Sequence, residues 1–159
     1  MINGIHHVSF ATTDLDRLMG FYRDLLGLED SGGGSFEPGF TALETIVGMT
    51  DIAGRAATLR TGNLQIEIFE YHSPVPRPVE PSPACDAGIR HLAFDVTDIY
   101  GEYRRLSAAG VEFLSAPQLM ENVSVISVYG RDPDGNMFEL QEIMPGSPLE
   151  RSWISRSIR

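Results

Sequence analysis

The sequence predicts an α+β fold in which two copies of one βαβββ module follow each other in a chain of 159 residues. The first observation is an internal repeat: residues 4–15 (GIHHVSFATTDL) and 88–99 (GIRHLAFDVTDI) align without a gap, with six identical positions. The second is that each copy alternates like a strand and is then followed by apolar residues at helical spacing. The third is that each half closes with Gly-Asn, at 62–63 and 135–136, before a strand that carries a glutamate. A repeat offset of 84 positions (88 − 4) is too long for a solenoid, so we expect one domain made of two modules.

The first half follows the module order. Thr13 is expected to cap a helix that runs to Leu26 and ends at Gly27, because glycine commonly follows the last helical residue. Further strands are predicted at 28–30, 40–47, 56–59 and 64–71, separated by a glycine-rich loop at 31–34 and a connection at 48–54. The last of these strands follows a hairpin signal at Gly62-Asn63.

A proline-rich segment separates the halves. Residues 73–83 contain five prolines and no periodicity, which excludes a helix or a central strand. In the second half, strands are predicted from 89 and at 111–114, 123–129 and 137–143, with a helix at 98–109 and a tight turn at 132–136. We therefore expect one domain, 1–159, with module 1 at about 4–72, a linker at 73–87, module 2 at about 88–144 and a tail at 145–159. Trp153 and Ile154 in the tail are candidates for docking on a neighbouring chain.

The composition of the chain indicates which binding partners and which cellular compartment to expect. A net charge of −10 argues against nucleic acid and anionic membrane surfaces. The single cysteine, Cys85, excludes a disulfide within the chain and fits a reducing compartment. Neither a signal peptide nor an apolar run of membrane-spanning length is visible. We therefore expect a cytoplasmic protein.

Four polar residues form two equivalent pairs, His7 with Glu67 and His91 with Glu139. Side chains alternate between the two faces of a strand. In all four strands this places the histidine or glutamate on the face opposite the bulky apolar residues that pack under the helix. Two half-barrels related by a pseudo-twofold axis would bring all four to one centre. The glutamates Glu70 and Glu142 have the parity of the apolar face, so we expect them at the solvated rim.

Two imidazoles and two carboxylates in one cavity are typical of a divalent-metal site. Without a thiolate ligand, Zn, Ni, Co, Mn, Fe and Mg all remain candidates. Four protein ligands leave two positions of a six-coordinate ion for water or for two substrate oxygens. A single histidine on a strand is more often structural, but the symmetric recurrence favours the metal interpretation. His6 has the opposite parity from His7, which favours a packed or surface position.

Three local motifs carry a resemblance to a known family. They are His7-Val8, the helix end at 21–28 (FYRDLLGL) and the turn and strand at 132–139 (DPDGNMFE). With these motifs the chain resembles the vicinal oxygen chelate superfamily over about 5–71 and 89–143. The superfamily includes glyoxalase I, methylmalonyl-CoA epimerase, extradiol dioxygenases and antibiotic-resistance binders. The resemblance implies a partly open barrel of tandem βαβββ modules around the metal, and it assigns His7, Glu67, His91 and Glu139 as metal ligands.

The resemblance also implies a reaction. We expect a metal-dependent lyase, isomerase or epimerase that chelates adjacent oxygens of a small substrate, with Glu67 and Glu139 moving a proton next to a carbonyl. Gln65, Ser9 and Tyr129 are candidates for pocket contacts, and family members of this size are commonly homodimers. The alternatives are an extradiol-type ring-cleaving dioxygenase and a non-catalytic binding or resistance protein. Glu67 as a fourth ligand argues against the dioxygenase, which uses two histidines and one carboxylate.

Overall fold

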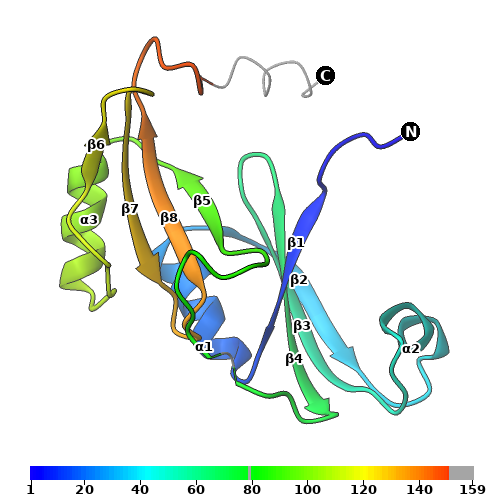
Figure 1. The fold of residues 1–159 in the computed structure, drawn as a ribbon. Helices are drawn as coiled ribbons and strands as arrows, with labels where there is room; N and C mark the ends of the chain where they lie inside the picture. Colours follow the sequence, from blue (N-terminus) through cyan, green and yellow to red (C-terminus); the bar gives the residue numbers. More distant parts are fainter. Residues whose placement is uncertain (79, 151–159) are drawn as a thin grey trace. The chain divides into compact units, whose positions relative to one another are not determined.

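Each half of the chain folds around its own four-stranded mixed sheet (Figure 1). A computed structural model describes residues 1–78 and 80–150, so Trp153 and Ile154 lie outside the described residues. The chain divides into two units, unit 1 at Met1–Pro78 and unit 2 at Val79–Arg159. Because β1 and β2 are the edge strands of one sheet and β5 and β6 those of the other, neither sheet closes on itself.

Unit 1 contains the sheet β1-β4-β3-β2. Its elements are β1 (His7–Thr12), α1 (Leu15–Met19), the π-helical turn η1 (Gly20–Leu25), β2 (Glu29–Phe36), α2 (Thr41–Val47), β3 (Ala53–Arg60) and β4 (Gln65–Ser73). Two of the three pairings, β3 with β4 and β3 with β2, are antiparallel, whereas β1 runs parallel to β4. Helix α1 packs against β3 and β4.

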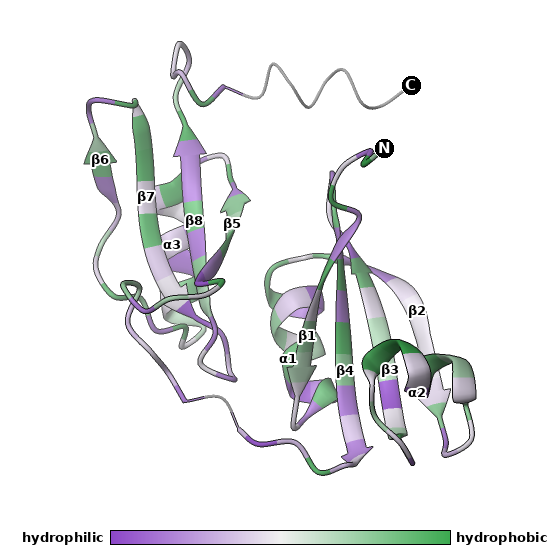
Figure 2. Cartoon of the chain, turned by 45° about the vertical axis from the view of Figure 1, so that its right-hand side comes forward, coloured by the Kyte–Doolittle hydropathy of each residue, from purple (hydrophilic) through white to green (hydrophobic). Residues whose placement is uncertain are grey.

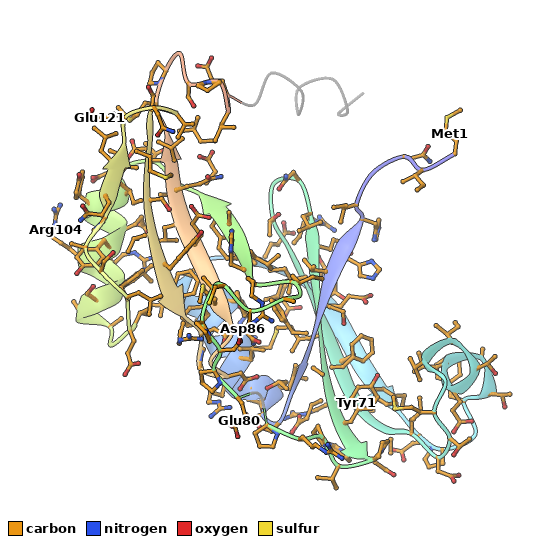
Figure 3. The ribbon with its side chains drawn as sticks, in the orientation of Figure 1. Met1, Tyr71, Glu80, Asp86, Arg104 and Glu121 are labelled. Carbon is orange, nitrogen blue, oxygen red and sulfur yellow. The ribbon has the colours of Figure 1, made fainter. Side chains whose placement is uncertain are left out.

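Unit 2 repeats this arrangement with the sheet β5-β8-β7-β6. Its elements are β5 (His91–Asp95), α3 (Ile99–Ala108), β6 (Gln118–Met120), β7 (Val125–Arg131) and β8 (Met137–Ile143). Helix α3 packs against β8, and Arg104 on its outer side is exposed to solvent (Figure 3). Within residues 1–78 and 80–150, no helix is long and apolar enough to span a membrane. The predicted α+β class and the tandem βαβββ modules are confirmed.

The core of each unit lies between its helix and one face of its sheet. Ile66 and Ile68 of β4 are fully buried, as is Leu18 of α1. In unit 2, Leu140 of β8 and Leu106 of α3 have the same role. Bands of purple and green alternate along β4 in Figure 2, as expected for a strand with one apolar and one polar face. The opposite face of each sheet carries the candidate site residues.

Several predicted elements of unit 1 are wrong in detail. Residues 40–47 were predicted as a strand, but 41–47 form the helix α2, and the position beside β3 in the sheet is taken by β2. The glycine-rich 31–34 is part of β2 rather than a loop. The cap of α1 is Asp14 rather than Thr13, since the Asp14 carboxylate accepts the Arg17 N–H at 3.0 Å.

One short strand of unit 2 was also misplaced. Residues 111–114 were predicted as a strand, but only Phe113 forms an isolated bridge, to Gly130. The edge strand is β6 instead. The Phe113 ring packs into the core against Phe138, with ring centroids 5.8 Å apart. Residues 111–114 are therefore placed by the packing of this ring, and pairing along the edge of the sheet begins only at β6.

The glutamates Glu70 and Glu142 are tied to the helices and are not at a solvated rim. The Arg55 guanidinium donates to Glu70 and, at 2.9 Å, to Asp16 of α1, which joins β3, β4 and the helix. Glu142 accepts the backbone N–H of Ile99 at the start of α3, at 2.9 Å. A carboxylate at this end of a helix pairs with an otherwise unsatisfied N–H group. Their position on the helix-facing side is therefore structural.

Gly54→Ala should destabilise unit 1 by about 1–3 kcal/mol, the usual cost of forcing extra volume into a packed site. A Cβ at Gly54 would lie 2.1 Å from the Glu70 carbonyl oxygen and 2.8 Å from Cζ of Phe36. Denaturant unfolding measures the effect. Gly34→Ala on the neighbouring strand is the matched control, because no atom lies within 4 Å of its added Cβ. Equal stability of the two variants would contradict the prediction.

Candidate metal-binding residues

In unit 1, His7 and Glu67 face each other across neighbouring strands. The parallel pairing of β1 with β4 sets His7 opposite Gln65 and Ser9 opposite Glu67. The two side chains therefore leave the same face of the sheet, and Nε2 of His7 lies 3.2 Å from Oε2 of Glu67. Both are partly open to solvent, with 42% of the His7 side chain and 32% of the Glu67 side chain exposed.

Unit 2 contains the same pair in the same register. His91 lies opposite Met137, and Ala93 lies opposite Glu139. Nε2 of His91 is 3.1 Å from Oε2 of Glu139. The Glu139 side chain is only 11% exposed, so this carboxylate is much more enclosed than its counterpart in unit 1.

Each unit thus brings together two of the four predicted ligands. No group of three or more His, Cys, Asp or Glu side chains with metal-binding geometry occurs within the described ranges 1–78 and 80–150. The union of the two pairs around one ion remains a prediction. The donor chemistry of each pair fits a divalent cation, because imidazole nitrogen and carboxylate oxygen are both common metal ligands and lie close together in each unit.

Two further residues complete the surroundings of the pair in unit 2. The Tyr129 ring lies 4.9 Å from the His91 ring, centroid to centroid, and Tyr129 is opposite Glu139 in the β7–β8 register. Burial and the negative charge of Glu139 both raise the pKa of Tyr129, so its hydroxyl stays protonated at neutral pH. The Ser127 hydroxyl donates a hydrogen bond to Oε1 of Glu139.

Sequence reasoning named Tyr129 but missed Ser127. The available signal was parity, because Ser127 is two residues from Tyr129 and therefore on the same face of β7. Its contact with Glu139 depends on the β7–β8 register, in which Ser127 is opposite Gln141. Registers of this kind are fixed by tertiary packing, so a single sequence does not reveal them.

The pair in unit 1 has different neighbours. Nδ1 of His7 lies 3.0 Å from Nδ1 of His6, so one of the two nitrogens carries the shared proton. His6 is exposed, as expected, yet its ring also contacts the His7 ring edge-on. Further along the same face, Phe69 and Tyr71 stack with their centroids 5.9 Å apart (Tyr71 is labelled in Figure 3). Burial raises the pKa of Tyr71.

The tandem modules and the repeated His–Glu pairs define a class of two-module α+β proteins with a candidate metal centre. Residues 4–140 match the Glyoxalase/Bleomycin resistance protein/Dioxygenase superfamily, and the chain belongs to this superfamily. The resemblance to vicinal oxygen chelate proteins is thereby confirmed.

Two of the sequence relatives are named as epimerases. The chain is 31% identical over 162 residues to a 2-epi-5-epi-valiolone epimerase of Actinomyces sp., covering 92% of this chain and 83% of that protein. It is 28% identical over 149 residues to the ethylmalonyl-CoA/methylmalonyl-CoA epimerase of Cereibacter sphaeroides, covering 90% of this chain and 100% of that protein. Among solved structures, a glyoxalase family protein from Bacillus cereus matches with a TM-score of 0.79 at 23% identity, over 89% of this chain and 95% of that chain. That last likeness concerns the fold.

Proposed function

We propose that this protein is a metal-dependent epimerase or isomerase of the glyoxalase type. The observation that carries the proposal is the duplicated His–Glu pair, in which the same two residue types occur at the same register in both units. A core-packing role does not explain this repetition, because all four side chains leave the sheet face opposite the helix. The epimerase relatives support the choice of reaction class.

In this proposal His7, Glu67, His91 and Glu139 together hold one divalent ion. Zn, Ni, Co, Mn, Fe and Mg all accept such nitrogen and oxygen ligands. The ion, when bound, would polarise a substrate carbonyl oxygen and so acidify the adjacent carbon. Glu67 and Glu139 are the candidates for removing and returning the proton, one on each side of the substrate. The other two strand glutamates are engaged elsewhere, Glu70 with Arg55 and Glu142 with the start of α3.

We propose a small-molecule substrate with two neighbouring oxygens and a carbon-bound proton next to a carbonyl. Gln65, Ser9 and Tyr129 are positioned for contacts with it, since each lies on a site face opposite or beside a proposed ligand. We further propose that the protein is a cytoplasmic homodimer without nucleic-acid or membrane partners, in keeping with its net charge of −10.

Metal removal tests this proposal. The chelator-treated full chain should exchange no substrate proton, and reloading with one of the six metals should restore exchange with deuterated water. The probes are 2-epi-5-epi-valiolone and methylmalonyl-CoA, chosen from the relatives' names. Deuterium uptake without oxygen consumption supports an epimerase. Metal-dependent oxygen consumption on a catechol would favour the ring-cleaving dioxygenase, and tight ligand binding without metal would favour a resistance-type binder.

A further inference from the structure

We propose that Ser127 is a positioning residue that fixes Glu139 as a metal ligand through one oxygen, and that unit 1 has no counterpart of this device. The inference rests on the proposed function, because it assumes that Glu139 binds the metal. It goes beyond that function by assigning a role to a residue outside the ligand set and by making the two glutamates unequal.

The two carboxylate oxygens of Glu139 contact different partners. Oε1 accepts the Ser127 hydroxyl, and Oε2 faces Nε2 of His91 at 3.1 Å. Because Ser127 orients Oε1, Oε2 is the oxygen that is positioned to bind an ion next to His91. Burial adds to the constraint, because a side chain that is 11% exposed has little room to rotate. Hydrogen bonds to the unbound oxygen of a ligating carboxylate are a common way to orient it.

The repeat makes the comparison with unit 1 direct. Thr58 is opposite Glu67 as Tyr129 is opposite Glu139, and the residue two positions earlier is Ala56 in unit 1 and Ser127 in unit 2. Ala56 has no hydroxyl to donate. Oε1 of Glu67 accordingly makes no hydrogen bond within the described part of the chain, and the Glu67 side chain is 32% exposed.

The two carboxylates therefore have different freedom to move. Glu139 is held at both oxygens and enclosed, which suits a ligand that stays on the metal. Glu67 is held at one oxygen only and is open to solvent, which suits a carboxylate that turns from the metal toward the substrate. The asymmetry assigns permanent ligation to Glu139 and proton transfer to Glu67.

A pair of isosteric variants isolates the hydroxyl. Ser127→Thr keeps the donor and Ser127→Val removes it, while both side chains have nearly the same volume and suit a strand. Co²⁺ is titrated into each metal-free full-length protein by calorimetry and by visible absorbance. We expect Ser127→Val to bind Co²⁺ about 10–100-fold more weakly than wild type, the usual cost of losing an outer-shell partner, with an altered visible spectrum, and Ser127→Thr to match wild type.

Controls separate the possible failures. Ser35→Ala, at an exposed position of β2, should leave Co²⁺ affinity unchanged. Metal-free unfolding midpoints show whether the Val and Thr variants fold equally well. Equal Co²⁺ affinity and spectra for Ser127→Val and Ser127→Thr would overturn the role of Ser127 while leaving the proposed function in place. Failure of the wild-type protein to bind Co²⁺, Ni²⁺ or Zn²⁺ would instead overturn the proposed function, and the inference with it.

Discussion

His91→Ala is expected to remove nearly all metal-dependent stabilisation of the protein. A metal present at 100 times its dissociation constant stabilises the folded wild-type chain by about 2.7 kcal/mol. Loss of a direct ligand should weaken binding at least as much as loss of an outer-shell partner, so we expect a decrease of about 100-fold or more. At the same metal concentration the variant would then gain at most about 0.4 kcal/mol.

Denaturant unfolding of each protein with and without metal measures the metal-dependent stabilisation. Taking the difference for the same variant cancels any effect of the substitution on the metal-free protein. His72→Ala is the matched control, because His72 is an exposed histidine near the end of β4. His7→Ala should behave like His91→Ala if both pairs bind the same ion, and the wild-type stoichiometry should be one metal for every two pairs. Full metal-dependent stabilisation in His91→Ala would contradict the ligand assignment.

The fold was predictable wherever hydrophobic periodicity is strong and short connections leave few choices. The bounds of β8, Met137–Ile143, were predicted to the residue, because apolar alternation follows a tight Asp-Pro-Asp-Gly-Asn turn. In that turn the buried Asp132 carboxylate accepts the backbone N–H groups of Asp134 and Asn136. Here local chemistry and tertiary structure agree, as is typical of foldable sequences.

The wrongly predicted segments are those whose structure depends on contacts with distant parts of the chain. Gly33 and Gly34 have the composition of a loop, yet they lie opposite Ala57 and Ala56 as part of β2. A Cβ at Gly33 would lie 2.1 Å from the Ala56 carbonyl oxygen, so the close approach of the two strands requires glycine there. Helix α2 is only seven residues long and buries none of them, so its short apolar pattern does not distinguish a helix from a strand.

Some contacts of the candidate site were likewise predictable from the sequence, and others were not. Strand parity correctly placed His7 with Glu67 and His91 with Glu139, since the face of a side chain depends only on counting along a strand. The contact of Ser127 with Glu139 also depends on which residues of β7 and β8 are opposite each other. The hairpins differ by one residue between the two halves, at 62–67 and 135–139, so the sequence alone did not establish that both glutamates share one register.

Glu67→Gln is expected to lower the rate of substrate proton exchange by about 10²–10⁴-fold, the usual contribution of a positioned general base. Glutamine keeps an oxygen that can face His7 but cannot take up a proton from carbon. Because Glu67 lacks the hydroxyl partner that Glu139 has, it is the carboxylate with the freedom to reach the substrate. Turnover should therefore fall much more than Co²⁺ affinity.

Glu139→Gln is the matched comparison and should show the opposite balance. Its amide places a neutral group beside His91 and Ser127, so Co²⁺ affinity should fall more than in Glu67→Gln, and saturating metal should recover part of the exchange rate. Deuterium uptake at saturating Co²⁺, measured for both variants, separates the two roles. If Glu67→Gln exchanged protons at the wild-type rate with metal bound, the base would have to be another group, and the unequal anchoring of the two carboxylates would have no catalytic meaning. If both variants lost exchange equally at saturating metal, each glutamate would serve one face of the substrate, as an epimerase with two bases requires.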